Sequence, residues 1–179
     1  MTQISMFPKF ASNLTTGLSN ESAWQHLESL SPKNYFNEYK NKDDVTSFIY
    51  FSDFKFDFQE SKKKELRLSG IEVKILRKGD NVKDYWVDLV FPINGDQISL
   101  TKNNKAQDNL WPYIYTDISY GGFKDKWNRK WSLDEINSDV FGIVVSSKAT
   151  KKKAEADIKR VEITIHYHEL KLYYNKKEL

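Results

Sequence analysis

Alternation of apolar and polar residues with a period of two most constrains how this chain can fold. Residues 161–168 alternate between apolar or aromatic residues and polar ones, and residues 54–58 and 71–75 repeat the pattern. Because successive side chains of a β-strand point to opposite sides, this pattern predicts strands with one buried and one solvent-facing side. We expect the inward-facing set to include Phe56, Ile71, Val73, Ile75, Val161, Ile163 and Ile165.

Two further runs depart from this alternation. Residues 48–51 and 85–91 are apolar on both sides of the expected strand in places. A strand with two apolar sides is typical of a sheet that is covered on both faces. We therefore expect these two strands to be covered on both sides.

Helical signals are few. Ser132 and Glu135 form a capping-box pattern, in which each side chain accepts a free backbone N–H of the first turn, and we expect this turn to end by Asn137. A second short helix is predicted over residues 22–30, before Pro32. Its apolar residues recur every three positions: Trp24, Leu27 and Leu30.

Composition agrees with a β-rich fold and excludes several classes. Aromatic residues make up 15% of the chain, which favours strands. The 28 basic and 25 acidic residues nearly cancel to a net charge of +3, which does not indicate a nucleic-acid-binding protein, and we expect no specific nucleic acid as a partner. There is no cysteine, so disulfides and thiol catalysis are excluded. Residues 1–10 lack the pattern of a signal peptide and no apolar run is long enough to cross a bilayer, so we expect no membrane association.

Many short strands with one helical turn predict an all-β fold, an antiparallel, jelly-roll-like β-sandwich. Residues 1–42 lack the two-residue period, and we interpret them as an extended N-terminal arm for attachment. Residues 43–170 would form the sandwich and residues 171–179 a C-terminal tail. If residues 1–18 only attach the domain, their removal would leave the sandwich folded. The arm residues expected to bind a partner are Ile4, Met6, Phe7, Phe10, Leu14 and Leu18.

A series of short motifs follows one another in a characteristic order. It begins with Gly-Ile-Glu-Val at residues 70–73 and continues through Arg-Lys, Val-Lys-Asp, Trp-Pro, Tyr-Gly-Gly, two tryptophans, Glu-Ile-Asn and Phe-Gly. It closes with Ile-Thr-Ile-His-Tyr at residues 163–167. This series resembles a widespread domain of bacteriophage structural and tail-associated proteins, over about residues 46–167. The loops here are rich in Lys and Asp, where the family has small, Gly- and Ser-rich loops.

The resemblance implies a non-enzymatic structural protein of the virion, made in the host cytoplasm. Its implied partners are other virion proteins of the capsid, portal, neck or tail, or further copies of the chain. The family provides no catalytic residues to transfer, and we expect no enzyme, because no catalytic triad order, paired catalytic carboxylates or phosphate-binding glycine loop is visible. The position in head, neck or tail stays open.

A dense aromatic series raises an alternative function, a host receptor- or carbohydrate-binding module of a tail or head fibre. Aromatic rings stack on sugars, and Tyr113 and Tyr115 are the candidates for glycan contact. A structural role in the core and in loops, in which tryptophan buries its ring while its N–H binds a carbonyl, is favoured for the series. The resemblance places Trp111, Trp127 and Trp131 at motif positions, which implies a shared structural role. The series comprises Trp111, Tyr113, Tyr115, Tyr120, Trp127 and Trp131.

Two polar clusters admit a functional and a plain structural interpretation. Glu162, His166 and His168 share one side of the last expected strand, where they would suit Zn²⁺, but a solvated strand face is favoured. We expect no metal and no cofactor. Lysines at 62–64 and 151–153 would contact packaged DNA or an acidic neighbour or, as we favour, form solvated hairpin tips.

Overall fold

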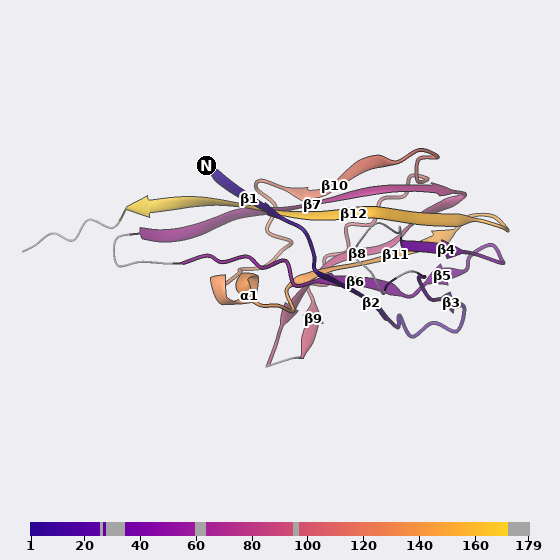
Figure 1. Cartoon of the computed structure of the whole chain (residues 1–179), viewed down its shortest axis with the longest axis horizontal. Coiled ribbons are helices and arrows are strands. Elements are labelled where there is room, and N and C mark those ends of the chain that lie inside the picture. Colours follow the sequence, from indigo (N-terminus) through magenta and orange to yellow (C-terminus); the bar gives the residue numbers. More distant parts are fainter. Residues whose placement is uncertain (26, 28–34, 60–63, 95–96, 172–179) are drawn as a thin grey trace, which may run out of the picture.

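The computed structural model describes residues 1–25, 27, 35–59, 64–94 and 97–171. Strands dominate these residues and form two sheets that pack face to face (Figure 1). The prediction of an all-β, sandwich-like fold is confirmed. No helix among these residues has the length and apolar character needed to span a bilayer.

Five of the described strands form the first sheet, sheet A. Its centre is the antiparallel pair of β7 (Lys64–Asp80) and β12 (Glu155–Lys171), which run along almost the whole molecule in Figure 1. β10 (Thr116–Gly122) pairs with the other edge of β7. β1 (Thr2–Met6) and β4 (Tyr35–Glu38) pair with different parts of the free edge of β12.

Seven of the described strands form the second sheet, sheet B. β11 (Gly142–Ala149) lies between β6 (Phe48–Ser52) and β8 (Val82–Pro92). β2 (Phe10–Leu14) pairs with β6, and β9 (Ile98–Leu100) pairs with β8. Two short strands complete the sheet: β5 (Val45–Thr46), which pairs with β11, and β3 (Glu21–Ser22), which is parallel to β5.

The main core lies between the two sheets and contains the inward-facing residues that alternation predicted. Each such side chain contributes roughly 1.5–3 kcal/mol by leaving water. The prediction is confirmed for all seven residues, which are at most 4% exposed: Phe56, Ile71, Val73, Ile75, Val161, Ile163 and Ile165.

The two helix predictions have different outcomes. α1 (Leu133–Asn137) has the expected capping box, with Ser132 Oγ accepting from the Glu135 N–H and Glu135 Oε2 accepting from the Ser132 N–H. The helix expected over residues 22–30 is wrong where the structure describes it, because Ser22 belongs to β3 and Gln25 forms an isolated β-bridge with Phe36. Residues 26 and 28–30 lie outside the described residues.

The alternation of residues 54–58 predicted burial correctly but secondary structure wrongly. Phe54, Phe56 and Phe58 are buried and their rings stack in sequence, yet β6 ends at Ser52. The two residues that flank Phe54 adopt the left-handed region, at φ 59° for Asp53 and 56° for Lys55. This backbone keeps the phenylalanines on one side without a strand ladder.

The N-terminal segment is extended, as expected, but its strands belong to the two sheets. β1 and β4 are edge strands of sheet A, and β2 and β3 lie in sheet B. Deleting residues 1–18 would remove β1 and β2 from their ladders, so this deletion should destabilise the sandwich, contrary to the expectation from sequence. At the other end, Lys171 still belongs to β12, and residues 172–179 of the expected tail lie outside the described residues.

Candidate interaction surface

The side of sheet B that faces away from the core carries a second apolar cluster. Strands β2, β6, β8, β9 and β11 all contribute to it, although they come from distant parts of the sequence. We call it the outer apolar cluster. It consists of Leu14, Phe48, Tyr50, Trp86, Val90, Ile98, Leu100 and Val144.

The two runs with apolar residues on both sides supply the centre of this cluster. In β6, Ile49 and Phe51 enter the main core, while Phe48 and Tyr50 face outward. Strand β8 divides in the same way, and its residues 86 and 90 face outward. Three members of the outer cluster are buried and the other five are half-buried. The chain therefore leaves this side of sheet B partly exposed to solvent.

A groove of about 600 Å³ runs over the outer apolar cluster. The rings of Phe48 and Trp86 meet edge to face on one side, with centroids 6.5 Å apart. A mainly apolar concave surface of this kind fits an apolar side chain better than a charged substrate. The groove is lined by Leu14, Thr15, Phe48, Trp86, Ile98, Ser99, Leu100, Lys102 and Val144.

Two buried polar groups fix the shape of this surface. The Tyr50 hydroxyl donates to the Val140 carbonyl at 2.5 Å, and burial raises the pKa of this hydroxyl to about 12. Asp88, on the outward side of β8, accepts hydrogen bonds from Thr101 Oγ1 and, at 2.8 Å, from the Lys102 N–H. Burial raises the pKa of the Asp88 carboxyl above its ordinary value. These bonds hold the chain that follows β9 against the sheet.

The six N-terminal residues expected to bind a partner do not form one surface. Leu14 joins the outer apolar cluster, whereas Ile4 and Met6 on β1 pack against the main core and are half-buried. Ile4 and Met6 therefore contribute to the sandwich itself rather than to a free arm. The remaining three are exposed: Phe7 (53%), Phe10 (64%) and Leu18 (40%).

Sequence reasoning did not name most residues of the outer apolar cluster as a site. The two doubly apolar runs were the signal for Phe48, Tyr50 and Trp86. Ile98 and Leu100 gave no signal, because β9 is only three residues long.

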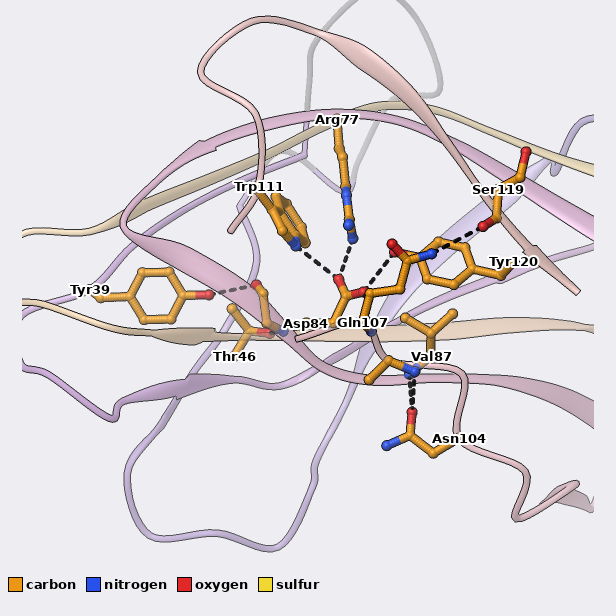
Figure 2. A network of polar contacts seen from close by, with 12 residues as sticks. Tyr39, Thr46, Arg77, Asp84, Val87, Asn104, Gln107, Trp111, Ser119 and Tyr120 are labelled. Carbon is orange, nitrogen blue, oxygen red and sulfur yellow. Dashed lines mark hydrogen bonds and ion pairs between the residues drawn. The ribbon is translucent and has the colours of Figure 1, made fainter. Parts of the chain in front are cut away.

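Part of the aromatic series lies inside the sandwich, around one buried ion pair (Figure 2). The Asp84 carboxylate forms an ion pair with Arg77 and accepts hydrogen bonds from Trp111 Nε1 and the Tyr120 hydroxyl, each at 2.8 Å. The Gln107 N–H also donates to Asp84, at 2.9 Å. The Arg77 guanidinium lies over the Trp111 ring, 4.3 Å from its centroid. Both oxygens of this carboxylate are thus engaged, as a buried charge requires.

Tyr115, the first glycan-contact candidate, is surrounded by groups of its own chain. Its hydroxyl donates to Asp157 Oδ2 at 2.7 Å. The ammonium groups of Lys78 and Lys159 lie 4.8 Å and 5.2 Å from its ring centroid. Both the hydroxyl and the ring are therefore already engaged.

Tyr113, the second glycan-contact candidate, has an open environment. Its side chain is 73% exposed. It lines a hollow of about 200 Å³ together with three acidic residues, Asp80, Glu155 and Asp157. Of the two tyrosines, Tyr113 is the one whose ring is accessible to a ligand.

The histidine cluster of β12 is not assembled as a metal site. His166 is buried, with Nε2 at 3.5 Å from Glu72 Oε2, whereas His168 is exposed. Among the described residues, no three His, Asp or Glu side chains come together in a way that suits a metal ion. Absence of a metal and of a cofactor stays a prediction.

Only the second of the two lysine clusters lies entirely within the described residues. Lys151, Lys152 and Lys153 are exposed in the turn between β11 and β12, which agrees with a solvated tip. Lys62 and Lys63 lie outside the described residues, and residue 64 begins β7.

Comparison with known proteins adds no relative to this picture. No family model, curated protein or solved structure matches the chain. The functional argument therefore rests on the ordered motifs of the sequence and on the surfaces described above.

Proposed function

We propose that this chain is a non-enzymatic structural protein of a bacteriophage particle, made in the host cytoplasm and located in the virion. In this proposal the sandwich is a rigid unit, and the outer apolar cluster docks onto a neighbouring capsid, portal, neck or tail protein. The observation that carries the proposal is the outer apolar cluster with its groove. The order of the sequence motifs is the reason for proposing a phage particle as the location.

The physical argument concerns what this face gains from a partner. Five members of the cluster are half-buried, and each would gain up to roughly 1–3 kcal/mol if a neighbour removed it from water. Lost rotational and translational freedom offsets much of this gain. In a particle with many copies, avidity compensates for this loss, so that contacts that are individually weak still keep the protein bound. An aromatic pair beside a groove is also typical of a protein–protein contact centre.

Incorporation into particles tests the proposal. We expect Ile98→Lys, which places a charge on the groove, to lower the abundance of the chain in purified particles strongly. Ser119→Lys adds the same charge on the exposed outer side of β10 and serves as the matched control, with wild-type abundance expected. Both isolated proteins should melt cooperatively. Normal incorporation of a folded Ile98→Lys variant would exclude docking through this face.

One observation favours a second function, recognition of a host surface glycan. Tyr113 presents an exposed ring at a hollow that Asp80 and Glu155 also line, and a ring with adjacent carboxylates suits the apolar face and hydroxyls of a sugar. A glycan array should then give specific signals that Tyr113→Ala abolishes and Phe7→Ala, at another exposed aromatic residue, retains. An array without signals would remove this candidate.

A further inference from the structure

The loop between β10 and α1 forms a basic hollow that the proposed docking function does not use. The hollow measures about 770 Å³. We call it the basic hollow. It is lined by Lys124, Asp125, Lys126, Asn128, Arg129 and Lys130.

Internal ion pairs leave three positive charges in excess. Asp125 pairs with Lys105 at 2.7 Å, and Arg129 pairs with Glu135 at 2.5 Å. The ion pairs therefore neutralise Asp125 and Arg129 and leave the charges of the three lysines of the hollow unneutralised, with the Lys124 ammonium 5.3 Å from the Phe123 ring centroid. Lys124, Lys126 and Lys130 are exposed and have no carboxylate partner among the described residues.

The loop that carries these lysines is anchored to the sandwich. Trp127 is fully buried, and its Nε1 donates to the Ile71 carbonyl at 3.0 Å. Trp127 and Asn128 both have positive φ, 53° and 55°, a conformation that persists only where surrounding contacts hold it. Trp131 Nε1 donates to the Lys126 carbonyl at 2.9 Å. The positions of the lysine backbones are thus fixed before any ligand arrives.

The backbone at the start of the loop lies directly against β7. A Cβ added at Gly70 would lie 2.2 Å from the Gly122 carbonyl oxygen and 2.4 Å from the Phe123 carbonyl carbon. The Asp125 carbonyl accepts from the Ile71 N–H at 2.8 Å. Glycine at position 70 therefore permits the loop to cross the strand.

The far end of the loop is held by an arginine between two aromatic rings. The Arg129 guanidinium carbon lies 3.6 Å from the Phe91 centroid and 4.6 Å from the Trp131 centroid. Its ion pair with Glu135 links it to α1. A side chain held in this way is preorganised, so little conformational entropy is lost when an anion binds next to it.

We propose that the basic hollow binds a polyanion that carries several phosphate groups, without sequence specificity. Ammonium groups are usual partners of phosphate, and the anchored loop presents three of them on one shallow, open surface. The small net charge of the whole chain does not conflict with this site, because the excess is local. Two sources share the required chemistry, a nucleic-acid backbone and a phosphodiester polymer of a cell surface.

Two variants with equal changes in net charge test this proposal. The triple variant Lys124→Gln, Lys126→Gln, Lys130→Gln removes the charges of the basic hollow. The triple variant Lys151→Gln, Lys152→Gln, Lys153→Gln removes three exposed lysines from the β11–β12 turn, which is the matched control. All six side chains are exposed, so we expect both variants to keep the wild-type melting transition.

Titration with inorganic tripolyphosphate at low salt provides the readout. We expect the hollow variant to bind roughly tenfold more weakly or worse, and its log Kd to depend less steeply on log salt than that of the wild type. The turn variant should stay within about twofold of wild type. Amide signals of residues 124–130 should shift on binding. Equal weakening in both variants, or no binding by the wild type, would overturn the proposal.

The same variants distinguish the two sources. A single-stranded oligodeoxynucleotide and poly(glycerol phosphate) are titrated in parallel, at matched phosphate concentration. Binding of a polymer that is lost in the hollow variant supports the site, and the polymer that binds more tightly is identified as its source. Binding of neither polymer, or binding that the hollow variant retains, would contradict the site. No result depends on incorporation into particles, so this inference fails or stands separately from the docking proposal.

Discussion

The outer faces of the two sheets differ sharply, although both sheets share one core. On sheet A the outer face is polar, and its strands are linked there by contacts such as Arg160 with Asp117 at 3.1 Å and Ser119 with Glu72 at 3.0 Å. On sheet B the corresponding face carries the outer apolar cluster. The polar residues of sheet A include Glu72, Lys74, Asp117, Ser119, Arg160 and Glu162.

This difference indicates which face needs a partner. Antiparallel sheets commonly have one face on the core and one in water, and sheet A follows that rule. Sheet B does not, because its outward-facing side chains form a contiguous apolar surface. Such surfaces on a folded domain mark contact sites or association-prone regions. Substitutions on the two faces should therefore change the free energy of unfolding by different amounts.

The largest effect should come from the buried ion pair that joins β7 of sheet A to β8 of sheet B. Asp84→Ala leaves Arg77, only 2% exposed, without its carboxylate, and we expect a loss of about 3–5 kcal/mol in the free energy of unfolding. Lys83→Ala, at the adjacent residue with an exposed Asp108 partner, should change it by less than about 1 kcal/mol. Denaturant unfolding measures both. Similar values would show that the pair does not hold the sheets together.

Paired substitutions on neighbouring residues sharpen the contrast between the faces. On sheet A, Ile163→Ala should cost about 2–5 kcal/mol, whereas Thr164→Ala, which loses a hydrogen bond with Ser5, should cost about 1 kcal/mol. On sheet B, Leu89 faces the core and Val90 faces outward, yet both residues are fully buried. Leu89→Ala should cost about 2–5 kcal/mol, and Val90→Ala still about 1.5–3 kcal/mol. Denaturant unfolding again gives the four values, and a Val90→Ala cost as small as that of Thr164→Ala would erase the distinction.

The pH dependence of stability should carry the signature of Asp88 beneath the outer face of sheet B. Burial raises the pKa of this carboxyl above 3.8, so the folded protein takes up its proton at a higher pH than the unfolded chain does. As the pH falls from neutral through the folded pKa towards 3.8, the free energy of unfolding of the wild type should therefore rise relative to Asp88→Asn.

Carboxyl-carbon NMR provides the direct measurement for Asp88, with Asp108, whose pKa the nearby Lys83 ammonium lowers, as the control. We expect Asp88 to titrate above its ordinary value and Asp108 below it. An Asp88 titration at or below the ordinary value would contradict this prediction, because the hydrogen bonds from Thr101 and Lys102, which lower the pKa, would then match or outweigh the effect of burial.

The smallest effect should occur at the rim of sheet B. Phe10 is 64% exposed, so Phe10→Ser should change the free energy of unfolding by no more than about 0.5 kcal/mol. Phe51→Ser, on the inward side of the paired strand β6, should cost more than about 3 kcal/mol. Thermal melting compares the two. A marked loss at Phe10 would place it in the fold and remove it from the exposed surface.

The features that could be predicted from the sequence depend on local periodicity. The inward positions of β7 and β12 follow from alternation alone. Val73 and Ile163, for example, pair across the ladder of these two strands and are both fully buried. The capping box of α1 was equally predictable, because it depends on four consecutive residues, from Ser132 to Glu135.

The features that the sequence did not reveal depend on contacts between distant segments. The outer apolar cluster joins five strands whose order in sheet B is not their order in the chain. The scattered apolar residues of the N-terminal segment resembled a free arm, because the β12 edge that pairs with β1 lies near the other end of the chain. Alternation in residues 54–58 predicted a strand, but the left-handed backbone at Asp53 and Lys55 is not that of a strand.

Accessibility of single cysteines in assembled particles tests the central claim most directly. The chain has no cysteine, so Ile98→Cys in the groove of sheet B and Ser119→Cys on the outer side of sheet A each introduce one probe. In the isolated protein both thiols should react with a maleimide reagent. In purified particles we predict that the thiol at position 98 is protected while the thiol at position 119 still reacts. Equal reactivity of both thiols in particles, or protection at position 119 alone, would contradict docking through the outer apolar cluster.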